Sequence, residues 1–168
     1  RQGNSALARG AAGLSFFRLS SDKWGGDKQP HMGNPEYAAI AAIVDGDVQP
    51  DGSILEIGPP DSTPVEPFVG MAVKKSGRTT GLTHGTVDAV DLTIIVGYSQ
   101  ACGKRPRMKA MFTNQIDILP GTFSAGGDSG SLVVEDVDTC PRPVGLLFAG
   151  GRRDTVANRI DDVLTALN

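Results

Sequence analysis

The chain has 168 residues, of which 39% are hydrophobic and 5% aromatic, with 22 glycines and 11 prolines. This length can bury a core as one globular domain or two small barrels, and short apolar runs between many glycines and prolines favour β-structure with frequent turns. The net charge of −3 gives no reason to expect a nucleic-acid partner, no apolar run approaches membrane-spanning length, and no signal peptide is visible.

The first third of the chain gives the weakest pattern. Residues 1–34 are turn-rich and predict either an irregular arm or a partly disordered terminus. Residues 37–44 form the first convincing apolar run, and their length and the following turn favour a buried strand over a short helix. Residues 53–58 alternate between apolar and polar side chains, which predicts a second strand.

A proline-rich stretch separates this part from the rest. Four prolines lie between residues 58 and 67, and proline lacks the N–H that a sheet ladder requires, so no central strand is expected there. We therefore expect two units, an arm with a partial first barrel over residues 1–66 and a second barrel over residues 67–168.

Residues 70–160 predict an all-β unit of six short strands bounded by turns. The expected strands span residues 71–75, 86–98, 108–119, 131–137, 144–149 and 155–160. Ile160, Val163, Leu164 and Leu167 then recur at helical spacing, which predicts a short amphipathic helix over residues 159–167.

A glycine-rich bend precedes one of these strands. Gly126-Gly127-Asp128-Ser129-Gly130-Ser131 is followed at once by an apolar run. Glycines permit positive φ and close backbone approach, so such a bend can aim consecutive N–H groups at one point, as an oxyanion requires. The motif differs from the lipase-type elbow G-x-S-x-G, because Ser131 stands where the second glycine belongs.

This bend and two further stretches resemble the C-terminal half of trypsin-like serine proteases, nearest a bacterial and plant branch. The stretches are Lys75-Ser76-Gly77-Arg78-Thr79-Thr80-Gly81-Leu82-Thr83, the glycine-rich bend itself, and Val144-Gly145-Leu146-Leu147-Phe148-Ala149-Gly150-Gly151. They occur in the order of the family, and the likeness covers residues 70–167. The resemblance implies trypsin-like antiparallel Greek-key barrels, with the C-terminal six-stranded barrel complete and the N-terminal barrel partial.

The resemblance also implies roles for individual residues. Ser129 would be the nucleophile, and the N–H groups of Gly127 and Ser129 would form the oxyanion hole. Asp128 would be a structural carboxylate that braces the loop. The substrate would meet two groups of residues, with Phe148, Ala149 and Gly150 as the strand edge for its backbone and Phe123, Ser124 and Ala125 as the wall of the side-chain pocket. With Phe123 in that wall, a preference for basic side chains is not indicated.

The base and the acid of a triad do not match the family pattern. Tyr37 stands where the family has the aspartate, and the usual histidine motif is absent. His84 is most simply a surface turn residue. His31 lies six residues before Tyr37, closer than in the family, and is the one candidate base within the chain.

Two functions therefore stay open. In the first, the chain is a serine endopeptidase domain or part of one, and its histidine is removed or supplied by an N-terminal chain or fragment. In the second, it is a protease-like domain without catalysis that serves as a binding or structural module. In the first case its partner is a peptide or protein substrate, and the isolated chain is expected to be weakly active or inactive. No cofactor, nucleic-acid or membrane partner is expected in either case.

Cys102 and Cys140 are the two cysteines. Both fall in turn-rich stretches, and we expect their Cα atoms to lie within disulfide range, roughly 4.4–6.8 Å. The alternative is two free thiols. Two cysteines do not decide the cellular compartment, and a secreted or extracytoplasmic location is favoured. No His/Cys spacing suggests a metal site.

Overall fold

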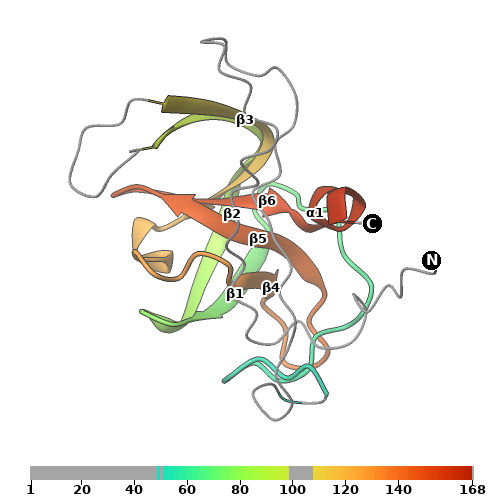
Figure 1. The fold of residues 1–168 in the computed structure, drawn as a ribbon. Coiled ribbons are helices and arrows are strands. Elements are labelled where there is room, and N and C mark those ends of the chain that lie inside the picture. The colour runs from blue at the N-terminus through green and yellow to red at the C-terminus, as the bar shows by residue number, and fades with distance from the viewer. Residues whose placement is uncertain (1–48, 50, 99–107, 168) are drawn as a thin grey trace.

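Six antiparallel strands form a closed barrel, followed by one short helix (Figure 1). The computed structural model describes residues 49, 51–98 and 108–167. The elements are β1 (Ala72–Gly77), β2 (Gly81–Tyr98), β3 (Met108–Leu119), the 3₁₀ turn η2 (Gly121–Phe123), β4 (Leu132–Glu135), β5 (Pro143–Gly150), β6 (Thr155–Arg159) and α1 (Ile160–Leu167). The all-β class, the barrel over residues 70–160 and the C-terminal helix are confirmed.

The strands follow the order β1-β2-β3-β6-β5-β4 around the barrel. β3 therefore neighbours β6 and not β4, which is a Greek-key arrangement and not a simple meander. The short β4 closes the barrel, because Val73 and Lys74 of β1 pair with Glu135 and Val134. This closure removes the open sheet edges that an exposed strand would present.

The barrel interior is filled by side chains from all six strands and from η2. Alternation along each strand turns every second side chain inward, and the apolar ones form one cluster. Its buried members are Met71, Val73, Val87, Ile116, Ile118, Phe123, Val133, Val144, Leu147 and Ala157. This rigid core is what holds the loops at the ends of the strands.

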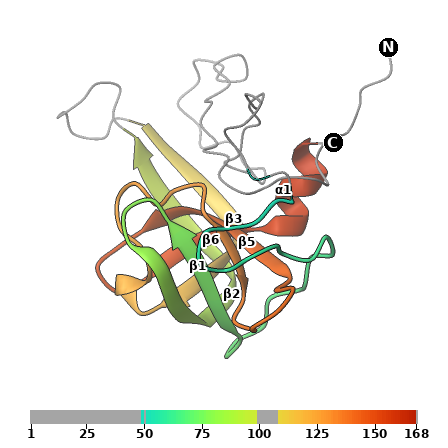
Figure 2. The same cartoon turned by 90° about the horizontal axis from the view of Figure 1, so that it is seen from below.

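The helix α1 covers a second, smaller apolar cluster outside the barrel. Ile160 and Val163 are buried there with Leu146 of β5. Asp162, in the first turn of the helix, accepts a hydrogen bond from Asn114 Nδ2 at 2.7 Å, and acidic residues at this end also suit the helix dipole. Figure 2 shows the helix against the barrel near β5 and β6. Among the described residues, no helix is long and apolar enough to cross a membrane.

Two of the expected strands differ from the structure. Residues 53–58 form a tight turn closed by the pair Ile54 and Gly58, not a strand. Glu56 has a φ of 65° inside this turn, and Leu55 is 77% exposed, so the alternation of apolar residues did not reflect a sheet face. Strand β2 begins at Gly81 and not at residue 86, because its first residues pair with β1 in a hairpin.

Several expectations fall outside the described residues. These are the arm over residues 1–34, the strand over residues 37–44, and with them the partial first barrel. Residues 59–68 contain no regular element. Two backbone bonds attach this stretch to the barrel, from Asp61 N to Pro141 O at 3.0 Å and from Val65 N to Pro143 O at 2.9 Å. The division of the chain at residue 66 stays a prediction.

Candidate active site

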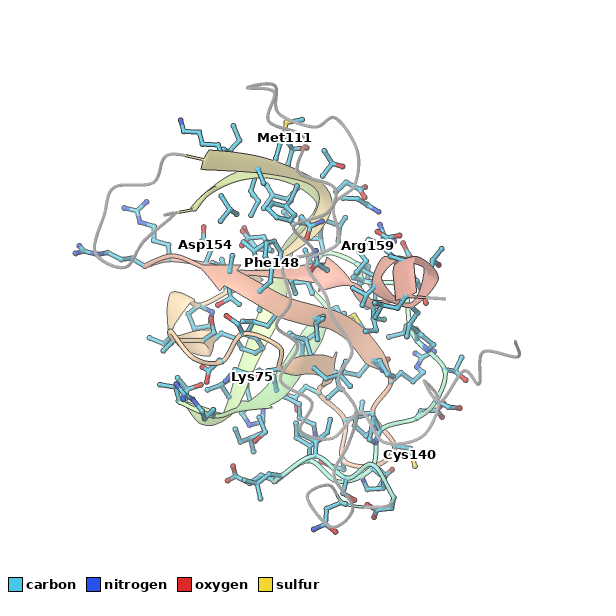
Figure 3. The ribbon with its side chains drawn as sticks, viewed as in Figure 1. Lys75, Met111, Cys140, Phe148, Asp154 and Arg159 are labelled. Carbon is cyan, nitrogen blue, oxygen red and sulfur yellow. The ribbon has the colours of Figure 1, made fainter. Side chains whose placement is uncertain are left out.

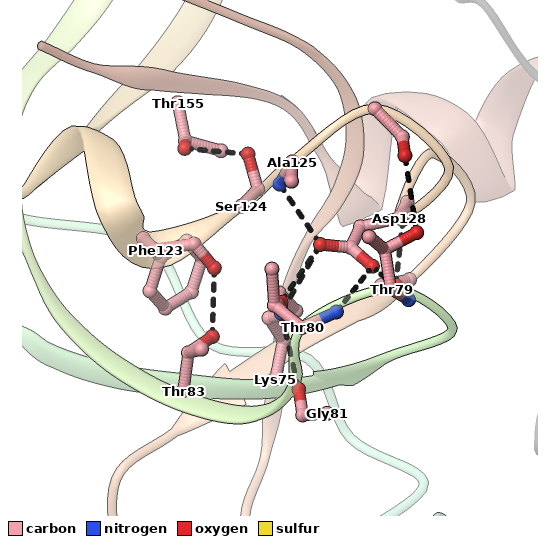
Figure 4. Close-up of polar contacts among 12 residues, drawn as sticks. Lys75, Thr79, Thr80, Gly81, Thr83, Phe123, Ser124, Ala125, Asp128 and Thr155 are labelled. Carbon is pink, nitrogen blue, oxygen red and sulfur yellow. Dashed lines mark hydrogen bonds and ion pairs between the residues drawn. The ribbon is translucent and has the colours of Figure 1, made fainter. Parts of the chain in front are cut away.

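The carboxylate of Asp128 is the centre of a buried hydrogen-bond network beside Ser129 (Figure 4). Oδ1 accepts from the backbone N–H groups of Thr79 at 2.7 Å and Thr80 at 3.2 Å. Oδ2 accepts from the N–H of Ala125 at 2.9 Å and from the hydroxyl of Thr80 at 2.8 Å. The carboxylate also packs against Gly77, where a Cβ would lie 2.5 Å from Oδ1. The β1–β2 turn and the glycine-rich loop are therefore joined through one side chain.

Lys75, labelled in Figure 3, lies on the inner face of β1 and faces this carboxylate (Figure 4). Its Nζ is 3.6 Å from Asp128 Oδ2, and both side chains are 0% exposed. The same Nζ donates to the Thr80 hydroxyl and to the carbonyl of Gly81, and it lies 5.6 Å from the ring centre of Phe123. A buried ammonium without such partners would cost several kcal/mol, so Lys75 and Asp128 stabilise each other.

Burial and hydrogen bonding act against each other on these two groups. Burial by itself raises the pKa of Asp128, but the hydrogen bonds from Ala125, Thr80 and Thr79 outweigh it and lower that pKa to about 2. Burial lowers the pKa of Lys75, and the neighbouring Asp128 charge opposes that shift without cancelling it. Asp128 is therefore ionised at neutral pH, as a structural carboxylate and not as a proton donor.

This pKa predicts an acid limit for the fold. The unfolded chain binds a proton on Asp128 near its ordinary value of 3.8, whereas the folded chain does so near 2. The resulting stabilisation of about 2 kcal/mol is present above pH 5 and is lost as the pH falls from about 4 to about 2. Urea unfolding between pH 6 and pH 2 measures it. The slope of unfolding free energy against pH should be smaller in Asp128→Asn, and equal slopes in the two proteins would contradict the assignment.

The loop that carries Asp128 and Ser129 is fixed on both flanks, which sets the position of Ser129. On one side, the hydroxyl of Thr79 donates to the carbonyl of Gly126 at 3.0 Å. On the other side, Gly130 N donates to the carbonyl of Leu147 in β5 at 2.7 Å, and Leu147 N donates to the carbonyl of Ser131 at 3.0 Å. The half-buried Ser129 thus sits between the β1–β2 turn and β5.

The two glycines before Asp128 are not equivalent. Gly127 has a φ of 108°, and a Cβ there would lie 2.5 Å from both Arg78 Nη2 and Thr79 Oγ1. A Cβ on Gly126 would meet nothing within 4 Å. Gly127 is therefore required by both conformation and space. Convergence of the Gly127 and Ser129 N–H groups into an oxyanion hole stays a prediction.

The predicted substrate-binding residues lie on two adjoining elements. The side chain of Phe123 is 1% exposed and belongs to the barrel core. The next residue, Ser124, shares a 2.7 Å hydrogen bond with the hydroxyl of Thr155 in β6. A Cβ on Gly150 would lie 3.2 Å from Ser124 Oγ, so the predicted pocket wall and the end of β5 are in contact.

The predicted edge strand continues beyond its partner. The register of β5 with β4 begins at Leu132 and Leu146, and β5 runs on to Gly150. Along this extension Ala149 and Gly150 pair with β6 on the other side. The ring of Phe148 lies 4.9 Å from that of Phe112, measured between centres. The extension starts directly beside the bonds that fix Ser129.

His84 is on the outer face of the sheet, away from the Asp128 network. It pairs with Lys74 in the β1–β2 register, so its side chain points to the face opposite Lys75. Its Nδ1 lies 2.8 Å from Asp136 Oδ2, and its side chain is 58% exposed. A surface position is confirmed, although the residue belongs to strand β2 and not to a turn. His31 and Tyr37 lie outside the described residues.

The sequence suggests no metal site and predicts that Cys102 and Cys140 lie within disulfide range. No group of three or more His, Cys, Asp or Glu side chains that would hold a metal ion occurs within the described ranges. Cys140 is exposed and has a φ of 46°. Cys140 is a free cysteine in the structure, so the predicted bridge is not present there; Cys102 lies outside the described residues, and the expected separation of the two Cα atoms stays a prediction.

Sequence reasoning named Asp128 as the brace of the loop but missed its cation. The signal was present in Lys74-Lys75 on strand β1, because alternation must turn one of two consecutive lysines inward. Closure of the barrel decides which lysine points inward. Val73 is buried in the interior, and Lys75, two residues further along the strand, lies on the same face. Lys74 instead donates to the carbonyl of Val137 at 2.6 Å on the outside.

One family model matches most of the chain. The family model of the Nal1 C-terminal domain matches residues 30–160, more than half of the chain. No curated protein matches the chain.

Solved structures of chymotrypsin-fold serine proteases are similar to the chain. They include a glutamic-acid-specific serine protease described as using a histidine triad in substrate binding (25% identity, TM-score 0.46, 79% of this chain and 59% of that one). The chymotrypsin of Cellulomonas bogoriensis follows (22% identity, TM-score 0.43, 62% and 50%), as does the Nocardiopsis protease NAPase (21% identity, TM-score 0.44, 62% and 50%). The chain thus spans between 50% and 59% of the length of these structures.

Proposed function

The chain belongs to the family of the Nal1 C-terminal domain, and we propose that it is a serine endopeptidase domain of the trypsin-like lineage in which Ser129 is the nucleophile. The observation that carries this proposal is the buried Asp128 network. The Asp128 carboxylate accepts four hydrogen bonds and faces a buried lysine, and this network fixes the loop directly before Ser129. A plain turn on a barrel does not require a desolvated ion pair beneath it.

The proposed reaction is acyl transfer. The hydroxyl of Ser129 attacks the peptide carbonyl carbon, a base takes the hydroxyl proton, and that proton passes to the departing amine as the C–N bond breaks. Water then hydrolyses the acyl group from Ser129. The N–H groups of Gly127 and Ser129 would stabilise the oxyanion, and the extension of β5 through Ala149 and Gly150 would align the substrate backbone.

The base has to come from outside the described residues. Asp136 holds His84 on the outer face of the sheet, so His84 is not proposed for this role. The remaining sources are His31 within the chain and a histidine of another segment or chain. Because Tyr37 stands where the family has its aspartate, the residue that would orient the base is also not identified.

Labelling with a fluorophosphonate probe tests the proposal, because this reagent reacts with an activated serine. We expect the 168-residue chain alone to label slowly and Ser129→Ala not to label. A system lacking its base retains only the catalysis of the oxyanion hole and binding, roughly a thousand- to ten-thousandfold over water. Mass spectrometry locates the modified residue, and Ser131→Ala serves as the matched control that should still label at Ser129.

The outcomes separate the two functions. Rapid labelling that is lost in His31→Ala would identify His31 as the base and contradict the expected low activity. Labelling that becomes rapid only with an added histidine-bearing N-terminal fragment would support a base supplied from outside. Absence of labelling under both conditions would contradict the protease proposal and favour a binding module.

A further inference from the structure

Arg78 is an exposed cation directly beside the loop that carries Ser129. A Cβ on Gly127 would lie 2.5 Å from Arg78 Nη2, so the guanidinium rests against the backbone of that glycine. Arg78 itself is exposed and forms no ion pair with any described residue. An arginine that has no carboxylate partner among the described residues, in a chain of net charge −3, can receive an anionic ligand.

The position of Arg78 is set by its neighbours in the turn. The N–H groups of Thr79 and Thr80 are held by the buried Asp128 carboxylate, and the Thr79 hydroxyl by the carbonyl of Gly126. Figure 4 shows Thr79 and Asp128 side by side where the two loops meet. The backbone that carries Arg78 is therefore anchored to the same network that positions Ser129.

The β1–β2 turn that carries Arg78 and strand β5 bond to the Ser129 loop on either side of Ser129 in the sequence. The β1–β2 turn contacts the loop through Gly126 and Asp128, whereas β5 contacts it through Gly130. A peptide whose acyl side follows the β5 extension would pass Ser129 and leave it on the Arg78 flank. The residues after the bond to be cleaved would then meet the guanidinium.

The buried carboxylate nearby does not neutralise Arg78. The four hydrogen bonds to the Asp128 carboxylate come from Thr79, Thr80 and Ala125, and its ion pair is with Lys75. A guanidinium offers a planar fork of N–H donors that matches a carboxylate with two parallel hydrogen bonds. The ligand chemistry that fits this position is a peptide carboxylate.

We propose that Arg78 is a specificity-determining residue that favours an acidic side chain on the leaving-group side of the cleaved bond. The inference rests on the proposed function for the direction of the peptide. It goes beyond that function by naming a substrate class, peptides with aspartate or glutamate just after the scissile bond.

Binding measurements test the inference without requiring turnover. The full chain carrying Ser129→Ala is titrated against fluorescent peptides that have Glu-Asp or Gln-Asn after the central bond and are otherwise identical. We expect the acidic peptide to bind about two- to fivefold more tightly at low salt, the range of an exposed ion pair, and the difference to shrink as salt screens it. Fluorescence anisotropy measures both affinities.

The second variant assigns the effect to Arg78. Adding Arg78→Gln should remove the preference, whereas Arg152→Gln should leave it, because Arg152 is an equally exposed arginine in the β5–β6 turn. Peptides with the acidic pair before the central bond should show no dependence on Arg78. Equal affinities for the two peptides, no binding of either, or a preference that survives Arg78→Gln would each overturn the inference.

The two proposals fail in different ways. If fluorophosphonate labelling is absent under every condition but the Arg78-dependent preference persists, the endopeptidase function falls and acidic-peptide binding stands. If Ser129 labels but the peptides bind equally, the function stands and the role of Arg78 falls.

Discussion

Asp128→Asn is expected to lower the free energy of unfolding by about 3–5 kcal/mol, the usual cost of removing one partner from a buried ion pair. The carboxylate is 1% exposed, and its loss leaves the ammonium of Lys75 buried without a countercharge. The asparagine amide can still accept from Thr79 and Thr80, but it carries no charge. Urea or thermal unfolding at pH 7 measures the change, and Ser129 labelling should fall with it.

A double-mutant cycle isolates the ion pair. Lys75→Met added to Asp128→Asn removes the stranded charge, so we expect the double variant to be more stable than Asp128→Asn alone. Asp51→Asn is the matched control, because Asp51 is exposed and, among the described residues, its carboxylate bonds to nearby Ser53. Its effect should stay within about 0.5 kcal/mol. Equal stability of Asp128→Asn and the native chain would show that the network does not hold the loop.

Gly127→Ala is expected to have the second largest effect, about 2–4 kcal/mol of stability, from backbone strain and overpacking together. The φ of 108° is one that L side chains rarely adopt, and the new methyl would lie 2.5 Å from both Arg78 Nη2 and Thr79 Oγ1. The exposed guanidinium of Arg78 can move aside, but the Thr79 hydroxyl is held by its bond to the carbonyl of Gly126. The strained backbone and this contact should shift the loop, so Ser129 labelling should fall by at least about a hundredfold, as on loss of one oxyanion donor.

The adjacent glycine provides the comparison. A Cβ on Gly126 meets nothing within 4 Å, so Gly126→Ala should change both stability and labelling little. Each variant adds one methyl group, at neighbouring positions of the same loop. Comparing them therefore controls for any general effect of a methyl group in this loop. Similar losses in both would mean that glycine flexibility, and not the fixed geometry at Gly127, is what the loop requires.

The barrel was predictable because its evidence is local and repeated. Short β-rich runs between turns recur along residues 70–160, and the helical spacing from Ile160 to Leu167 is clear. Residues 53–58 misled because alternation over so short a stretch does not distinguish a strand from a turn whose buried Ile57 happens to point inward. The start of β2 was missed because the sequence indicates a turn over residues 77–81 and no strand directly after it, whereas pairing with β1 makes residues 81–86 part of the strand.

The amino-acid sequence by itself determined the class of the fold, the position of the glycine-rich bend and the identity of Ser129 as the candidate nucleophile, because periodicity and motif spacing are properties of neighbouring residues. Only the tertiary structure decided that Lys75 and not Lys74 faces Asp128, that His84 pairs with Asp136 on the outer surface, and that Arg78 rests against Gly127. Each of these contacts joins segments about fifty residues apart in the chain. Closure of the barrel chooses which side of each strand is inside, and that choice sets the charges around the site.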